Sequence, residues 1–143
     1  MKLILLIFVI GLHWNAVFAQ NPITWSFDYN QEEKQLELSA ELEEGWHIYS
    51  QFLEEGTGPV ATNFEFEENP LVAINAVEEP KVKPIFDENF GDYILYHKNK
   101  VLFKVPVIIK ESTIVKGSVL YMLCNDSGCL PPDVTQFEIP VIK

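Results

Sequence analysis

Hydrophobic and polar residues alternate along most of the chain after residue 20. Every second position is apolar in 25–29, 36–42 and 101–109. Successive side chains of a β-strand point to opposite faces, so a period of two predicts strands with one buried side and one side facing solvent. Shorter stretches of similar composition predict further strands at 62–67, 71–77, 93–97, 118–123 and 135–142.

Glycine, proline and asparagine separate these stretches, and no segment has the hydrophobic period of a convincing amphipathic helix. About eight short strands around one hydrophobic core, each with a polar face, are typical of two packed antiparallel sheets. We therefore predict an all-β fold, an antiparallel β-sandwich. No linker or low-complexity segment interrupts the pattern, so residues 20–143 are expected to form one domain.

Residues 1–19 differ from the rest and have the pattern of a secretory signal peptide. Lys2 is followed by the apolar run 3–12, and small residues precede a cleavage site near Ala19. The apolar run of about ten residues is too short to span a bilayer, and charged residues, proline or glycine interrupt every later apolar run. We expect a periplasmic or secreted protein without direct membrane insertion.

The chain is acidic, with 10 lysines, no arginine and 21 Asp and Glu residues, which gives a formal net charge of −11. Removal of residues 1–19 would take away Lys2 and leave 10 − 1 = 9 lysines against 21 acids, a net charge of −12. Nucleic acids and anionic membranes are bound through clustered cations. This composition argues against either of them as a partner.

The two cysteines, Cys124 and Cys129, are separated by Asn-Asp-Ser-Gly, a sequence that favours a tight turn with Gly128 at a positive φ. The two sulfur atoms can therefore meet. Three interpretations remain open: a structural disulfide, which is common in exported proteins, a redox-active pair, or a thiol pair that binds Cu(I) with Met122. A closed loop of about six residues stabilises a fold by only about 2 kcal/mol, so this pair is poorly placed as a structural link.

The residues around the cysteines resemble the N-terminal periplasmic domain of the DsbD thiol:disulfide interchange protein family. That family has a Tyr-x-x-Cys, a short polar loop with Asn or Asp, a second Cys and then Pro-Pro. This pattern is matched here by Tyr121, Cys124, 125–126, Cys129 and 131–132. The resemblance implies an immunoglobulin-like sandwich in which the two cysteines are the catalytic residues. We expect no cofactor and no metal ion.

A second part of the resemblance is the stretch 86–92. The family has an Asp-Glu-aromatic-Gly loop that caps the disulfide, and Asp87, Glu88, Phe90 and Gly91 match it. The resemblance therefore implies that Phe90 shields the sulfur atoms between encounters with partners. Without the family, Phe90 would be interpreted as an ordinary core aromatic residue, and the two acids as part of a solvated turn.

The third part of the resemblance is the sequence Gly-Trp-His-Ile-Tyr that ends at Tyr49. It is similar to a family strand whose second aromatic position and final Tyr lie beside the disulfide, and these positions carry over to His47 and Tyr49. The two residues share a face if the segment is extended. An imidazole next to a thiol would lower the pKa of the thiol. The alternative is a strand with Trp46 and Ile48 in the core and His47 exposed.

Other polar residues receive simpler interpretations. Asp126 and Asp133 flank the cysteines and would raise a thiol pKa if they lie close, so the pair is expected to be a weak nucleophile in isolation. Such a pair fits an electron relay better than a strong oxidant or reductant. His97 precedes Lys-Asn-Lys in an apparent hairpin turn and is expected to be solvated.

The favoured hypothesis is a thiol-disulfide oxidoreductase that relays electrons through Cys124 and Cys129. It would pass them from a membrane-embedded electron transporter to thioredoxin-fold proteins. Members of the family usually carry a transporter and a thioredoxin-like domain in the same chain, so we expect separate polypeptides to supply them here. The alternative is a non-enzymatic secreted β-sandwich that binds protein or sugar through its aromatic residues and contains a structural disulfide.

Overall fold

The computed structural model describes residues 21–143 except 55 and 57. Within this part of the chain all regular secondary structure is β-strand, which confirms the all-β fold class. The described residues include no helix long and apolar enough to cross a membrane. The signal peptide predicted at 1–19 lies outside the described residues, so it stays a prediction, as does the domain boundary at residue 20.

The strands agree with the alternation of hydrophobic and polar residues. The three clearest stretches form β1 (Ile23–Asn30), β2 (Gln35–Leu42) and β9 (Lys100–Ile109). The others are β3 (His47–Tyr49), β4 (Asn63–Phe66), β5 (Val72–Ile74), β6 (Ile85–Asp87), β7 (Asp92–Ile94), β8 (Tyr96–Lys98), β10 (Thr113–Tyr121), β11 (Leu123–Asn125), β12 (Gly128–Cys129) and β13 (Asp133–Val141).

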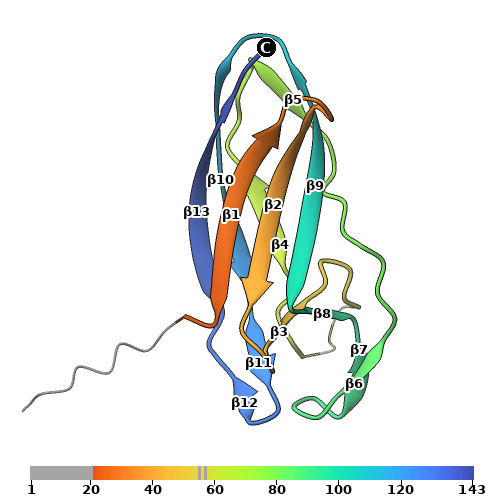
Figure 1. Ribbon diagram of the computed structural model, residues 1–143. Helices are drawn as coiled ribbons and strands as arrows, with labels where there is room; N and C mark the ends of the chain where they lie inside the picture. The colour runs from red at the N-terminus through yellow and green to blue at the C-terminus, as the bar shows by residue number, and fades with distance from the viewer. Residues whose placement is uncertain (1–20, 55, 57) are drawn as a thin grey trace, which may run out of the picture.

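Two antiparallel sheets face each other and form a sandwich (Figure 1). One has the strand order β1-β2-β9-β5 and the other β13-β10-β4. Alternate residues of both sheets point into the space between them and bury their apolar surface there. The resulting main core includes Leu36, Leu38, Phe103, Val105, Val115, Val119, Phe137 and Ile139.

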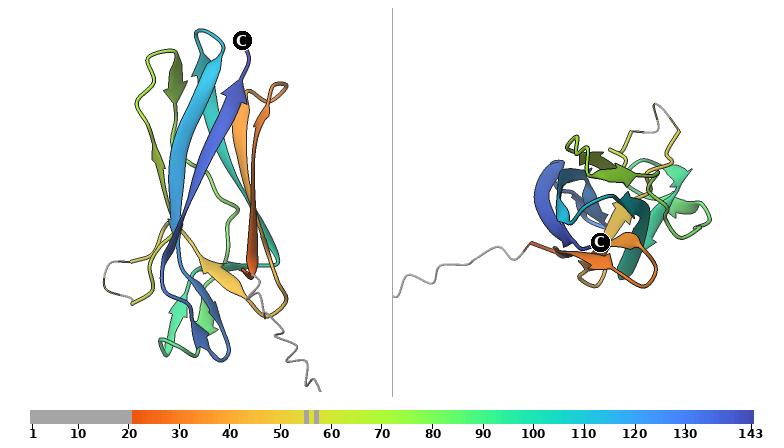
Figure 2. Two further views of the ribbon diagram at one scale, coloured as in Figure 1. Left: turned by 90° about the vertical axis from the view of Figure 1, so that its left-hand side faces the viewer. Right: turned by 90° about the horizontal axis from the view of Figure 1, so that it is seen from above.

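A smaller part of the molecule extends from one end of the sandwich, opposite the end where the chain terminates (Figures 1 and 2). It consists of a four-stranded sheet with the order β12-β11-β3-β8 and a two-stranded hairpin, β6-β7. The predicted strand 118–123 is divided here, because β10 ends at Tyr121 and β11 begins at Leu123. This break carries the chain from the sandwich into the small sheet, where the cysteines lie.

The prediction that His97 is a solvated turn residue is wrong. His97 lies on β8, is 4% exposed, and places its Nε2 atom 3.4 Å from Glu79 Oε1. The chain instead turns at Asn99, whose φ of 62° lies in the left-handed region that asparagine tolerates. Because β8 pairs with β3, the imidazole of His97 is turned inward, where its ring lies 6.0 Å from that of Phe103.

Glu79 fastens the irregular segment that leads to the β6-β7 hairpin. Its carboxylate accepts hydrogen bonds from the hydroxyl of Ser50 and from the backbone nitrogen of Gln51, the latter at 3.0 Å. Burial opposes ionisation of this group, but the nearby imidazole of His97 and the hydrogen bonds from Ser50 and Gln51 outweigh it and hold the pKa of Glu79 below its usual range. The charged carboxylate thus anchors this segment to the residues that follow β3.

Candidate redox site

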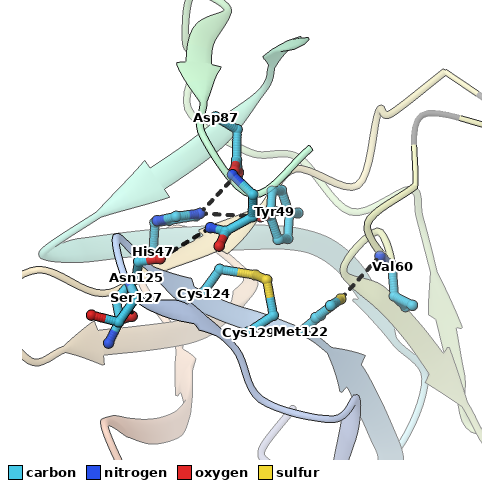
Figure 3. Close-up of polar contacts among 10 residues, drawn as sticks. His47, Tyr49, Val60, Asp87, Met122, Cys124, Asn125, Ser127 and Cys129 are labelled. Carbon is cyan, nitrogen blue, oxygen red and sulfur yellow. Dashed lines mark hydrogen bonds and ion pairs between the residues drawn. A yellow bond between two sulfur atoms is a disulfide. The ribbon is translucent and has the colours of Figure 1, made fainter. Parts of the chain in front are cut away.

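The cysteines lie on a short hairpin formed by β11 and β12. Cys124 and Cys129 are directly opposite each other and are joined by a disulfide bond. The backbone nitrogen of Ser127 donates to Asn125 Oδ1 at 2.8 Å, and Gly128 has a φ of 148°. The turn chemistry expected from Asn-Asp-Ser-Gly is therefore present, and the two sulfur atoms meet as predicted (Figure 3).

His47 is the neighbour of Cys124 on the next strand. In the antiparallel pairing of β3 with β11, His47 lies directly opposite Cys124, and such pairs place their side chains on the same face with Cβ atoms roughly 4.5–5.5 Å apart. His47, Cys124 and Cys129 therefore form a row across three strands. Tyr49 shares the face of His47, as predicted, and both are buried. The alternative in which His47 is exposed is wrong.

Three buried polar side chains meet above this row, and one of them comes from the β6-β7 hairpin. Tyr49 Oη donates a hydrogen bond to Asp87 Oδ2 at 2.6 Å. His47 Nε2 lies 3.2 Å from the same carboxylate oxygen and 3.1 Å from Tyr49 Oη (Figure 3). The other oxygen of Asp87 accepts from the backbone nitrogen of Asn89 at 2.9 Å. We call His47, Tyr49 and Asp87 the polar triad.

The polar triad contains one ionised group. Burial alone would raise the pKa of Asp87, but the hydrogen bonds from Tyr49, Asn89 and His47 outweigh it and lower this pKa. Burial lowers the pKa of His47, against the attraction of Asp87, so the imidazole is neutral near pH 7. Because the Asp87 carboxylate only accepts hydrogen bonds, neutral His47 carries its proton on Nε2. Burial, followed by the hydrogen bond to Asp87, raises the pKa of Tyr49, so this side chain keeps its proton.

The β6-β7 hairpin and its turn lie over the disulfide as a cap. The turn closes through a 2.8 Å hydrogen bond from Gly91 N to the carbonyl of Asp87, with Gly91 at a φ of 67°. Asn89 Nδ2 donates to the carbonyl of Asn125 on the cysteine hairpin at 3.0 Å. Asp87 points inward and is buried, so its interpretation as part of a solvated turn is wrong, whereas Glu88 is exposed as that interpretation expects.

Phe90 packs beside the disulfide and not in the sandwich core. It belongs to a second, small apolar cluster whose buried members are Tyr49, Ile94, Tyr96 and Cys124. Its ring is edge-on to that of Tyr49, with centroids 6.0 Å apart. Cys129 is only partly buried in the same cluster, while Cys124 is fully buried. Cys129 is therefore the more accessible of the two cysteines.

Two residues of the cluster received no role in the redox hypothesis. The ring of Tyr96 stacks on His47 with centroids 4.1 Å apart, and Met122 Sδ accepts a hydrogen bond from Val60 N at 3.5 Å. Tyr96 comes from β8, so only the pairing of β8 with β3 brings it to the site. Asp133, one of the two acids that flank the cysteines in the sequence, accepts a hydrogen bond from Tyr121 at 3.2 Å.

Comparison with known proteins agrees with this geometry. The family model described as thiol:disulfide interchange protein DsbD, N-terminal, matches residues 15–140. No match is found among curated proteins. The reduced DsbD N-terminal domain of Neisseria meningitidis has a similar structure, with a TM-score of 0.63, 15% identity and coverage of 85% of this chain and 87% of that one.

Two further structures are similar. The complex between the DsbD N-terminal and PilB N-terminal domains of Neisseria meningitidis matches with a TM-score of 0.61 and 13% identity over 87% of both chains. The N-terminal periplasmic domain of ScsB from Proteus mirabilis matches with a TM-score of 0.52 and 16% identity over 83% of this chain and 44% of that one. These likenesses confirm the immunoglobulin-like sandwich. With a family model matched over most of its length, the chain belongs to the family of the N-terminal domain of the thiol:disulfide interchange protein DsbD.

Proposed function

We propose that this domain relays electrons outside the cytoplasm by reversible thiol-disulfide exchange at Cys124 and Cys129. It takes electrons from a membrane-embedded electron transporter and passes them to thioredoxin-fold proteins in the periplasm. Membership of the DsbD N-terminal family supports exchange chemistry. The complex of a DsbD N-terminal domain with PilB supports a protein partner, and the periplasmic description of the ScsB domain supports the location.

The observation that carries the proposal is the position of the disulfide. It joins two strands of a short hairpin at the end of the molecule. It does not link the two sheets of the sandwich, and it lies outside the main core. A bond in so small a loop contributes little to stability. The hydrogen-bonded cap instead covers it with Phe90 and Asp87, an arrangement suited to a bond that reacts only with selected partners.

The exchange takes place in two displacements. A thiolate of the reduced partner attacks Cys129 Sγ, the Sγ–Sγ bond breaks, and Cys124 leaves as a thiolate that takes up a proton. The second thiolate of the partner then attacks the first partner sulfur, which is bonded to Cys129 Sγ in the mixed disulfide. Cys129 is released as a thiolate and is also protonated. The partner is oxidised to a disulfide and this domain gains two electrons and two protons. The reverse sequence reduces the disulfide of an acceptor protein.

The polar triad contributes to this exchange reaction through His47. His47 lies across from Cys124, which is the leaving sulfur in the first displacement. A nearby imidazole that gains a proton stabilises a thiolate. The negative charge of Asp87 favours that protonated imidazole, because it raises the pKa of His47 against the effect of burial. His47 thereby makes the buried Cys124 a better leaving group than its surroundings alone would allow.

A trapping experiment tests the relay. In Cys124→Ser, the accessible Cys129 has no partner within the chain to resolve a mixed disulfide, so we expect the variant to retain a thioredoxin-fold protein from a periplasmic extract. Cys129→Ser leaves only the buried Cys124 and should retain less. If neither variant captures a thiol protein, the relay is contradicted.

The redox potential of the Cys124/Cys129 couple gives an independent check. A structural disulfide has a potential below about −300 mV, and a relay has a higher one. A value below that limit would favour the alternative of a secreted binding module with a structural disulfide. Equilibration of the purified protein in glutathione or dithiothreitol buffers, followed by thiol counting, measures it.

A further inference from the structure

The outer face of the cap hairpin carries an exposed aromatic pair. Phe86 on β6 and Tyr93 on β7 are cross-strand partners, with ring centroids 5.4 Å apart. Successive side chains of a strand point to opposite faces, so Phe86 points away from the disulfide while its neighbour Asp87 points toward it. Phe86 is 47% exposed and Tyr93 is 69% exposed.

The aromatic surface continues onto the loop beside the hairpin. Phe52 is 64% exposed and lines a shallow hollow of about 270 Å³ together with Pro84 and Tyr93. We call Phe52, Phe86 and Tyr93 the cap patch. Aromatic side chains bury large areas, and their grouping on a surface marks sites of protein association. The cap patch therefore has the composition of the centre of a protein interface.

The position of the cap patch selects its occupant. A specific protein interface buries roughly 800 Å² on each partner, which corresponds to a disc with a radius of about 16 Å. Phe86 is bonded in sequence to Asp87, and Asp87 contacts Tyr49 in the cluster that contains Cys124. A protein that reaches the sulfur atoms therefore covers or borders the cap patch, so that the patch continues the contact surface around the disulfide.

We propose that the cap patch is the docking surface for the thioredoxin-fold protein that exchanges with Cys129, an inference that rests on the proposed function. The β6-β7 hairpin pairs with no other described strand, and Asp87 and Phe90 hold its inner side. A protein bound to the outer side contacts the β6-β7 hairpin directly. Docking there places that protein against the same hairpin that packs beside the disulfide.

A comparison of two reductants tests this docking surface in the mature protein. The variant is the double substitution Phe86→Ser and Tyr93→Ser. The matched control is Ile108→Ser, because Ile108 is 64% exposed and lies on β9 in the sandwich. Reduced thioredoxin is the protein probe and dithiothreitol is the small probe. We expect the double variant to react at least tenfold more slowly with thioredoxin, with the dithiothreitol rate within twofold of wild type and the control unchanged in both.

Each other outcome overturns the inference in a recognisable way. Unchanged reduction by thioredoxin would show that the cap patch is not used. Equal loss of both rates would show that the substitutions act on the cap itself. A wild-type dimer in sedimentation that the double variant abolishes, with exchange rates unaltered, would make the patch a self-association surface. A wild-type disulfide that neither reductant opens would contradict the proposed function, and the docking surface with it.

Discussion

At the scale of single residues, the polar triad joins positions far apart in the sequence through one ionised carboxylate. His47 and Asp87 are 40 residues apart, yet their side chains lie within 3.2 Å. A buried charge is costly unless hydrogen bonds satisfy it, and Asp87 accepts them from Tyr49 and from the backbone of Asn89. The triad therefore holds the cap in place, and its Asp87 opposes the lowering of the pKa of His47 by burial.

Stability should fall on mild acidification because of His47. Its folded pKa is lowered, while in the unfolded chain it is about 6.5. As the pH falls through about 6.5 the unfolded chain binds a proton that the folded protein does not, so the free energy of unfolding decreases, by at most about 1.4 kcal/mol per pH unit for one proton. Urea denaturation between pH 7.5 and 5 measures this slope.

The variant His47→Gln supplies the control for this pH dependence. Glutamine does not titrate, so the slope between pH 7.5 and 5 should become flatter than in wild type. A wild-type free energy of unfolding that is constant over this range would contradict the lowered pKa. A slope that persists unchanged in the variant would assign the proton to another group. Further losses are expected below about pH 4.5, because the pKa values of Asp87 and Glu79 are lowered in the folded state.

At the scale of elements, the β6-β7 hairpin pairs with no other described strand. It forms a two-stranded sheet of its own, and isolated hairpins are marginally stable in water. Its position depends on the inward side chains of Asp87, Ile94 and Phe90 and on the hydrogen bond from Asn89 to the cysteine hairpin. Such an element can move without disturbing the sandwich.

Phe90→Ala should loosen the cover over the disulfide. We expect reduction by dithiothreitol to accelerate several-fold, because Phe90 packs in the cluster around Cys124. The free energy of unfolding should fall by less than the roughly 3–5 kcal/mol that removal of a core phenylalanine costs. Phe103→Ala is the matched control, since Phe103 is fully buried in the main core and should show that larger loss with little direct effect on the disulfide. An unchanged reduction rate in Phe90→Ala would remove its shielding role.

At the scale of the whole molecule, the apolar side chains form two separate cores. The main core lies between the two sheets of the sandwich, and the small cluster surrounds the disulfide at one end. The cysteines belong to the second core alone. This division separates the part that confers stability from the part that is expected to change its covalent state.

Reduction of the disulfide should leave the fold intact. Because the bond closes a loop of only about six residues, its loss should cost about 2 kcal/mol or less. We expect the far-ultraviolet circular dichroism spectrum to be unchanged in excess dithiothreitol and the protein to unfold in one cooperative transition at a slightly lower temperature. Cooperative unfolding on reduction alone would instead identify a structural disulfide.

Much of the fold follows from local sequence patterns. The period of two in 25–29, 36–42 and 101–109 identifies β1, β2 and β9, because that alternation places one face of each strand in a core. The disulfide follows equally from local chemistry, since Asn-Asp-Ser-Gly is a turn that brings its flanking residues together. Short strands are less well determined, and the division of 118–123 between β10 and β11 has no local signal.

The sequence by itself determined the long strands β1, β2 and β9, the acidic charge and the cysteine turn, because each depends on neighbours within a few residues. Only the tertiary structure decided which polar residues are buried. Asp87 is charged and inward because β6 packs over β3, and His97 is buried because β8 pairs with β3 and the chain turns two residues later. Burial and pKa depend on what the rest of the chain packs against each side chain, which no local pattern contains.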